Sequence, residues 1–463
     1  MVRRVARPVL VAAFAAFAAS AATAVEVKPL VNVRLRWDLF DTPLARAGRD
    51  ATYDYGMVQV RAGAVVAFSP ELELKGLLQG AAMTALPSTA DFGPGPTYLA
   101  TNGGDREPSD LGLAELALTW KRERFTLVAG RQGYSEGIES VPGVPLLDYV
   151  ARRRLAERLV GNFEYPNIGR RYDGARLGLV PTASAKLDLY ALRLLAGAFN
   201  YEDAFERLDV ELAGFGVTSA HGAWLPATSV RLFGNLYRDD RDVARAQTGG
   251  DIEVTTFGGS ALAGTAEWDL LGWLAFQRGD YGASDLEAWA AIVEAGRRFG
   301  GVRGAPSLHL VWERASGGGR PGRREAFFNL LPTNHKFYGS VDTSAFSNLS
   351  DLYLEARWTP TPKWNASVAL HDFRLVDRGD AWYAGAGAFS DRELGYVARR
   401  PAGGRFSSSS IGRELDLVVS RALPRGFEAK VELGWFDGGA AASEILVADD
   451  DGGALSLELS WKL

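Results

Sequence analysis

The feature that most constrains this chain is a two-residue alternation of apolar and polar side chains that recurs along nearly its whole length. In residues 427–435, for example, every second residue is apolar, and Glu428, Lys430 and Glu432 stand between them. Successive side chains of a β-strand point to opposite faces, so each such segment predicts a strand with one apolar and one polar face. We count about eighteen of these segments, each long enough for the ~9–11 tilted residues that cross a bilayer.

The connections between the segments alternate in length. Tight turns such as Ser69-Pro70 and residues 121–123 alternate with long stretches such as residues 83–108, 133–169 and 315–348. Short periplasmic turns and long extracellular loops are typical of outer-membrane barrels. The sequence therefore predicts an all-β fold: a transmembrane β-barrel of about eighteen antiparallel strands.

Aromatic side chains gather near the tight turns and the C-terminus, on the apolar face of each strand. They are Phe68, Trp120, Phe125, Trp358, Trp364, Phe427 and Trp461. Amphipathic rings concentrate at membrane–water interfaces, so this belt favours a barrel in a membrane. A soluble β-sandwich would also alternate, but it would not need an outward ring of this kind.

The N-terminus predicts export. Arg3, Arg4 and Arg7 precede an apolar run over residues 9–19, and Ala22-Thr23-Ala24 offers a signal peptidase the small residues that it needs. The run is too short for a transmembrane anchor. We therefore expect a signal peptide over residues 1–24 and a single barrel domain over residues 25–463 in the bacterial outer membrane.

Composition narrows the function. The formal net charge is −5, which argues against a nucleic-acid partner. The four histidines show no pairing suited to catalysis at an outer rim, and no His, Cys or carboxylate cluster has metal-ligand spacing. We expect no enzyme, no cofactor and no metal. A barrel of this strand number is wide enough to hold an aqueous channel.

Three sequence blocks carry a family resemblance. The most specific is Leu331-Pro332-Thr333-Asn334-His335-Lys336-Phe337-Tyr338-Gly339, followed by Asp342 and Asn348-Leu349. The other two are Ala129-Gly130-Arg131-Gln132, and residues 158–161 with residues 171–176. Together they resemble the alginate-export family of outer-membrane proteins, over essentially the whole mature chain.

The resemblance implies an eighteen-stranded monomeric barrel that passively exports an anionic polyuronate through a constriction lined by arginines and a few carboxylates. By position it carries over Arg131, Arg176 and Arg357. Periodicity adds Arg36 and Arg61 as inward residues of early strands, and Asp351 and Glu355 share the polar face of Arg357. The inward faces also carry many acidic side chains, which is a departure from what the conduit of a polyanion is expected to have.

A polar cluster in the long loop of residues 315–348 is the predicted constriction. Its members are Asn334, His335, Lys336, Tyr338 and Asp342. We expect this loop to fold back into the barrel mouth, although an outward surface loop would fit the same residues. The densest basic group, six arginines within residues 152–171, fits either a solvated loop face or the lumen.

The predicted function is an outer-membrane channel for an anionic polysaccharide or oligosaccharide similar to alginate. The alternative is a porin for small anionic solutes such as carboxylates or phosphate, and a different class is a surface barrel whose loops bind partners. We expect outer-membrane lipid and lipopolysaccharide to surround the barrel. Periplasmic secretion partners are compatible with this function, and we expect no nucleic-acid partner.

Overall fold

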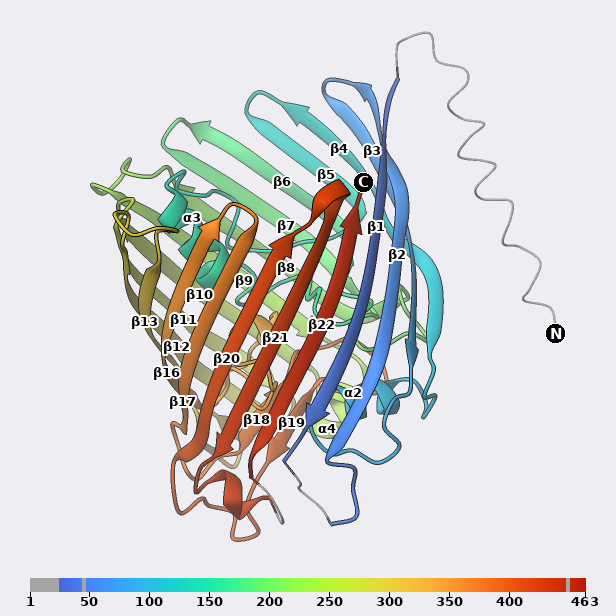
Figure 1. Cartoon of the computed structure of the whole chain (residues 1–463), viewed down its shortest axis with the longest axis vertical. Helices are drawn as coiled ribbons and strands as arrows, with labels where there is room; N and C mark the ends of the chain where they lie inside the picture. The colour runs from blue at the N-terminus through green and yellow to red at the C-terminus, as the bar shows by residue number, and fades with distance from the viewer. Residues whose placement is uncertain (1–24, 44–46, 447–449) are drawn as a thin grey trace, which may run out of the picture.

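Eighteen long antiparallel strands form one closed ring in the computed structural model, which describes residues 25–43, 47–446 and 450–463 (Figure 1). Each strand pairs with the next along the chain, and the ring closes where β1 (Glu26–Asp41) pairs with β22 (Gly452–Lys462). The predicted all-β barrel is confirmed. The predicted signal peptide, residues 1–24, lies outside the described residues.

The other strands of the ring follow in chain order: β2 (Thr52–Ser69), β3 (Leu72–Thr84), β4 (Ser109–Arg122), β5 (Phe125–Gln132), β6 (Tyr172–Thr182), β7 (Ala185–Leu195), β8 (Arg207–Ser219), β9 (Thr228–Asp239), β10 (Ile252–Gly264), β11 (Trp268–Tyr281), β12 (Ser284–Arg298), β13 (Ser307–Ala315), β16 (Leu349–Thr361), β17 (Trp364–Leu375), β20 (Ser410–Ala422) and β21 (Phe427–Gly438). The loops hold short strands and helices: α2 (Pro94–Thr101), α3 (Pro145–Val150), η1 (Ala151–Leu155), α4 (Asp242–Thr248), β14 (Gly319–Arg320), β15 (Arg323–Arg324), η2 (Asn334–Lys336), β18 (Trp382–Gly385), β19 (Tyr396–Arg399), η3 (Pro424–Gly426) and η4 (Ala442–Glu444).

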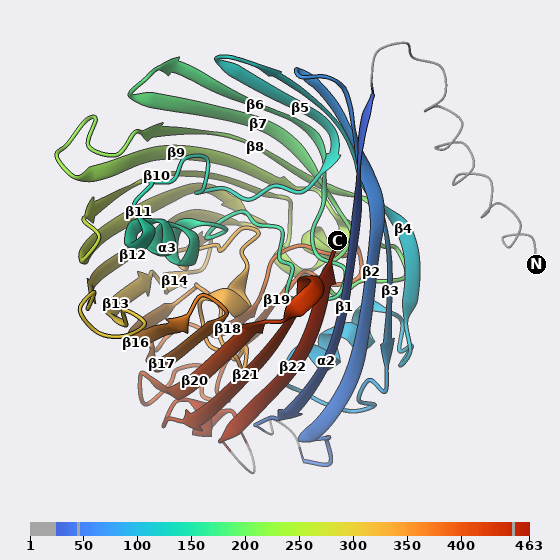
Figure 2. The same ribbon diagram turned by 45° about the horizontal axis from the view of Figure 1, so that its top comes forward.

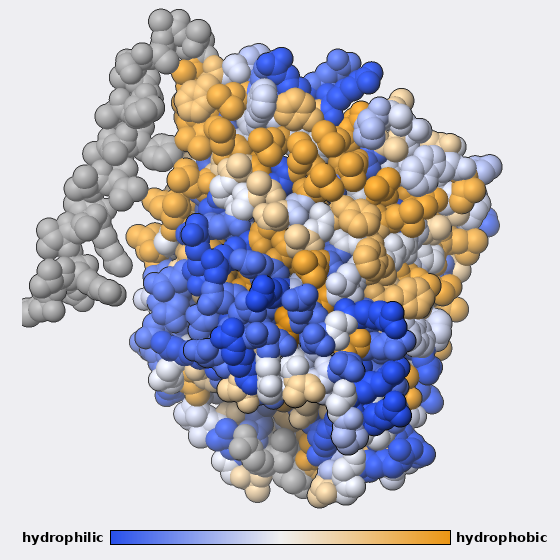
Figure 3. All heavy atoms as spheres, turned by 180° about the vertical axis from the view of Figure 1, so that it is seen from behind, coloured by the Kyte–Doolittle hydropathy of each residue, from blue (hydrophilic) through white to orange (hydrophobic). Residues whose placement is uncertain are grey.

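The two faces of each strand differ as the alternation predicts. On β16, Leu352 and Leu354 are each 48% exposed, whereas Asp351 and Glu355 are buried. The acids therefore point into the ring and the leucines point out. In Figure 3, apolar side chains cover much of the upper part of one outer face, and hydrophilic ones gather below them.

Tight turns lie at one end of the barrel and long loops at the other (Figure 1). We call these the short-turn end and the long-loop end. One connection at the long-loop end is itself tight, because β11 and β12 are joined through Gly282 and Ala283. There the neighbouring loop extends the wall, since β15 pairs with the start of β12.

The interior of the ring is filled by its own loops. Buried residues of the loops, such as Leu331, Phe346 and Trp382, share one apolar cluster with lumenal strand residues such as Phe233 and Trp273. Residues 133–171 form one of these loops, and their helix α3 lies inside the ring (Figure 2).

Contacts show how far α3 reaches. A Cβ added to Gly264, at a short turn, would lie 2.9 Å from Leu147 of α3. The segment that leaves β5 at the long-loop end thus extends to the opposite end of the barrel. In the described part of the chain, every helix falls short of the length and apolar character that a bilayer-spanning helix requires.

Candidate functional site: the lumen and its folded loops

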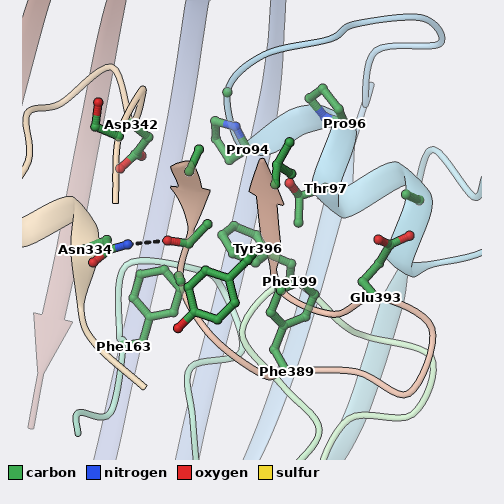
Figure 4. A pocket seen from close by; sticks show the side chains of 18 of the residues that line it. Pro94, Pro96, Thr97, Phe163, Phe199, Asn334, Asp342, Phe389, Glu393 and Tyr396 are labelled. Carbon is green, nitrogen blue, oxygen red and sulfur yellow. Dashed lines mark hydrogen bonds between the residues drawn. The ribbon is translucent and has the colours of Figure 1, made fainter. Parts of the chain in front are cut away.

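Two cavities lie inside the barrel on either side of a packed layer of loops. The outer cavity, about 270 Å³, is lined by α2, β18, β19 and aromatic residues such as Phe163 and Phe389 (Figure 4). The inner cavity, about 450 Å³, is lined by the halves of the strands near the short turns. Asp342 lines the outer cavity and His335 the inner one, and these two side chains are bonded to each other.

The layer between the cavities centres on His335. Its Nδ1 lies 2.8 Å from an Asp342 carboxylate oxygen, and its Nε2 lies 3.1 Å from Glu432. Its ring stacks on Tyr165, with centroids 3.4 Å apart. Burial lowers the pKa of His335, but the Asp342 and Glu432 carboxylates outweigh burial and raise it to about 9. The imidazole is therefore a cation at neutral pH.

Arg36 holds Tyr165 in place. Its guanidinium donates to the Tyr165 carbonyl at 2.5 Å and lies 4.3 Å from the centroid of the tyrosine ring. Asp38, on the same strand, forms a 3.0 Å ion pair with Arg36. A wall residue thus fixes the loop ring on which His335 stacks.

Next to this layer, acidic side chains of the lumen wall accept hydrogen bonds from the loop backbone. The backbone N–H of Ser340 donates to Asp416 at 3.2 Å, and that of Val341 donates to Glu414 at 2.8 Å. Gly339 makes this approach possible: its φ is +83°, and a Cβ there would lie 2.4 Å from the Glu414 carboxylate. Each of these two acids thus holds the loop through one backbone N–H.

The arginine-rich segment, residues 152–171, binds further acidic side chains of the wall. Arg158 donates to both Glu313 oxygens, at 2.7 and 2.9 Å, and to the Tyr338 hydroxyl at 2.8 Å. Arg154 bonds Glu294 at 2.7 Å and also bonds Glu355. Both arginines are buried, so this segment is part of the lumen and not a solvated loop face.

The wall of the inner cavity also carries cations, among them Arg34, Arg153, Lys336 and Arg357. Arg153 lies 3.8 Å from Glu355, and Lys336 lies 3.7 Å from Glu157. Arg34 donates to the carbonyls of Glu164 and Pro166 at 2.6 and 2.9 Å, and neither Arg34 nor Arg357 makes an ion pair with any described residue. Burial lowers the pKa of Lys336 to about 8, and its ammonium donates to the Ala156 carbonyl at 2.9 Å.

Aromatic faces accompany these cations. Tyr149 and Tyr165 line the inner cavity, and the Arg357 guanidinium lies 4.2 Å from the centroid of the Tyr149 ring. A site with guanidinium groups and aromatic faces can bind carboxylates and the apolar faces of sugar rings.

The structure places most of the proposed pore residues on the lumenal face. Four of them face the lumen: Arg36, Asp351, Glu355 and Arg357. The carboxylate of Asp351 lies 2.8 Å from His371 Nδ1. Arg61 bonds Gln79 and Glu164, each at 2.5 Å, behind the inner cavity.

Arg176 also faces inward, because its strand neighbours Val128 and Tyr190 are buried lumenal residues.

Arg131 was predicted to line the pore, and the structure places it on the outer face instead. It shares a face with Phe125 and Leu127, and its neighbour across the ladder, Leu116, is 40% exposed. Its guanidinium pairs with Asp173 at 2.9 Å. The match to Gly-Arg-Gln placed Arg131 at the end of a strand, but it did not indicate which face of that strand the side chain occupies.

The loop cluster lies inside the barrel. Asn334 donates to the Gly385 carbonyl beside the outer cavity (Figure 4). The remaining members, His335, Lys336, Tyr338 and Asp342, make the lumenal contacts given above.

Sequence reasoning missed Tyr149 and Tyr165, and it gave Arg153 no specific role. Tyr165 lies between the two family-like blocks at residues 158–161 and 171–176, which is the signal that could have drawn attention to it.

A closed eighteen-stranded barrel with an apolar outer face and a charged lumen defines this protein as a channel of the bacterial outer membrane. The alginate-export family model matches residues 150–446, and the chain belongs to that family. Family and fold are non-enzymatic in general.

Solved porins share the fold at low identity. OccK9 (OpdG) of Pseudomonas aeruginosa superposes with a TM-score of 0.58 at 15% identity, covering 94% of this chain and 98% of its own. OpdK of P. aeruginosa, in a structure with vanillate, gives 0.56 at 12%, covering 94% and 98%. OccK2 (OpdF) of P. aeruginosa, in complex with glucuronate, gives 0.56 at 11%, covering 95% and 96%. No curated protein matches the chain.

Proposed function

We propose that this protein is a diffusion channel for anionic saccharides of the uronate class, including oligosaccharides similar to alginate. The observation that carries the proposal is the inner cavity, where Arg34 and Arg357 lie on the wall without a carboxylate partner among the described residues. The channel works as a monomer in this proposal, since the ring closes within one chain.

The chemistry of the inner cavity fits a uronate. Each sugar carries one carboxylate, which a guanidinium can bind through two parallel hydrogen bonds. Asn365, Ser367 and Ser420 line the same cavity and offer polar groups to sugar hydroxyls. Family membership and the glucuronate complex of OccK2 support the same class of solute.

Passage requires the layer between the cavities to move. Because His335 and Asp342 separate the two cavities, a solute crosses only when their contact opens. Two backbone hydrogen bonds, to Glu414 and Asp416, hold the loop here, so local unfolding of this segment would open the path.

Planar-bilayer recording tests the proposal. Alginate oligomers added to the wild-type channel should block its current, and Arg357→Gln should raise the blocking concentration by about 10- to 150-fold, corresponding to the ~1.5–3 kcal/mol of a charge-assisted hydrogen bond. Arg131→Gln is the matched control, because it removes the same group from the outer face. Equal effects of the two substitutions would contradict the proposal.

A porin for small anionic solutes is the second candidate. The two cavities are small, about 270 and 450 Å³, and OpdK is described with vanillate. Liposome swelling separates the candidates: entry of glucuronate and vanillate without any block by oligomers of four or more sugars would favour the small-solute porin.

A further inference from the structure

Three histidines of the lumen each lie beside two carboxylates, and two of them share one arrangement. Asp342 and Glu432 lie at opposite nitrogens of His335, at 2.8 and 3.1 Å. Asp351 and Asp416 likewise lie at opposite nitrogens of His371, at 2.8 and 3.6 Å. A doubly protonated imidazole has one N–H for each side, so each ring nitrogen of these two histidines faces one carboxylate.

His309 differs, because both of its carboxylates lie at the same nitrogen. Glu294 lies 2.8 Å and Asp269 lies 3.6 Å from Nδ1, whereas Nε2 bonds the Ser307 hydroxyl at 2.9 Å. One Nδ1–H can donate well to only one of the two acids. The Asp269 carboxylate is 1% exposed, and neither of its oxygens has a hydrogen-bond partner. A buried carboxylate without a donor is costly unless a cation compensates it.

The strands bring these groups to one point. Asp269 of β11, Gly296 of β12 and His309 of β13 form a row across three neighbouring strands, with Glu294 two residues from Gly296 on the same face. One ligand atom from each of Asp269, Glu294 and His309 lies within 4.8 Å of the others.

Glycine at position 296 leaves the space between them. A Cβ there would lie 2.1 Å from an Asp269 oxygen and 2.4 Å from His309 Nδ1.

We propose that Asp269, Glu294 and His309 bind a divalent transition-metal cation such as Zn²⁺ in the barrel wall. One imidazole nitrogen and two carboxylates are ligands that Zn²⁺ accepts, at about 2.0–2.2 Å from the metal. The Ser307 hydroxyl fixes the second nitrogen of His309, and Arg154 holds the second oxygen of Glu294 at 2.7 Å. Asp269 then has the cationic partner that its burial requires. The metal has a structural role: it ties three strands together and, through Arg154, positions η1 inside the lumen.

No local pattern of residues predicts this cluster. Its members lie on three strands, 25 and 15 residues apart in the chain, and alternation places them only on a common face. This metal site is independent of the solute that the channel carries.

Zinc binding to the folded, tag-free barrel in detergent tests the proposal. The protein is stripped with a chelator, reloaded with ZnCl₂ and washed, and its metal content and thermal midpoint are measured. Wild type should retain about one Zn²⁺ per chain and melt at a higher temperature with zinc. Asp269→Asn should weaken binding by at least about tenfold. Without metal, the same variant should melt above the stripped wild type, because it removes a buried charge that has no hydrogen-bond donor.

Asp351→Asn is the matched control, since Asp351 is an equally buried aspartate beside His371 whose partners lie on opposite nitrogens. It should leave zinc binding unchanged. His221→Gln in both backgrounds removes the remaining histidine outside these clusters. If Asp269→Asn does not fold, Co²⁺ added to wild type should still give the visible absorption of a ligated ion. Wild type that retains no zinc and gives no Co²⁺ band, or equal zinc loss in Asp269→Asn and Asp351→Asn, overturns the proposal.

Discussion

At the residue scale, Arg158 and Glu313 show how loop and wall depend on each other. Both side chains are 0% exposed and share two hydrogen bonds. Arg158→Met should destabilise the protein by about 3–5 kcal/mol, because it leaves the Glu313 charge buried and unpaired. Arg158→Met with Glu313→Met should recover most of this loss, since two apolar side chains carry no buried charge. Urea unfolding measured by tryptophan fluorescence checks both, and equal losses in the single and double variants would contradict the pairing.

His335 makes the constriction sensitive to alkali. Its folded pKa is about 9 and its ordinary value is 6.5, so its stabilising ion pairs are complete below pH 6.5 and are lost as pH rises through 9. Asp342, Glu432 and the stacked Tyr165 face the imidazole, and none of them replaces its charge. Single-channel current should become noisier between pH 8 and 10, and mean conductance should rise.

The neighbouring Lys336 changes stability in the opposite direction. Its folded pKa of about 8 is below the ordinary 10.5, so its contribution improves as pH rises from 8 to 10.5. His335→Gln should therefore abolish the alkaline increase in current noise, and Lys336→Met should sharpen it. A wild-type increase that persists in His335→Gln would show that another group controls the loop.

The lumenal residues were predictable where alternation decides the face and unpredictable where only a partner does. Asp351, Glu355 and Arg357 follow from the clean pattern of β16. Arg131 lies at the end of the eight-residue strand β5, where a motif match says nothing about the face, and its prediction was wrong. The partner of Arg154, Glu294, is 140 residues away, so no local pattern could identify it.

At the scale of elements, the loop between β13 and β16 should control the pore. Replacing residues 317–344 by a tight turn removes η2 and the contacts of Ser340 and Val341 with the wall. The barrel should still fold and show heat-modifiable migration, because its ring of strands is intact. Single-channel conductance should rise clearly and ion selectivity should weaken. Unchanged conductance would mean that residues 133–171 alone close the lumen.

Strands were predictable and loop paths were not, for a physical reason. A wall strand faces lipid on one side and water or polar groups on the other, and this difference makes apolar and polar residues alternate along the strand. Loop segments pack against many distant partners without a repeating environment. The fold of residues 133–171 along the lumen therefore left no periodic signal, although its six arginines marked it as unusual.

At the scale of the whole molecule, the formal net charge of −5 should not set the ion selectivity. Charges further than about 10 Å from the path are screened at ordinary salt, whereas Arg34 and Arg357 lie on the wall of the inner cavity. Reversal potentials in a salt gradient should show that anions carry more current than cations. Arg34→Gln with Arg357→Gln should reduce this preference, and cation selectivity in wild type would contradict the assignment of the cavity.

The reach of α3 has a mechanical consequence. Residues 133–171 enter and leave the barrel at the same end, yet Leu147 touches the turn at Gly264 on the opposite side. Both ends of this segment join the wall, at β5 and β6. We therefore expect a solute that pushes on α3 from the periplasm to displace the segment more easily than one that pushes from the cell surface.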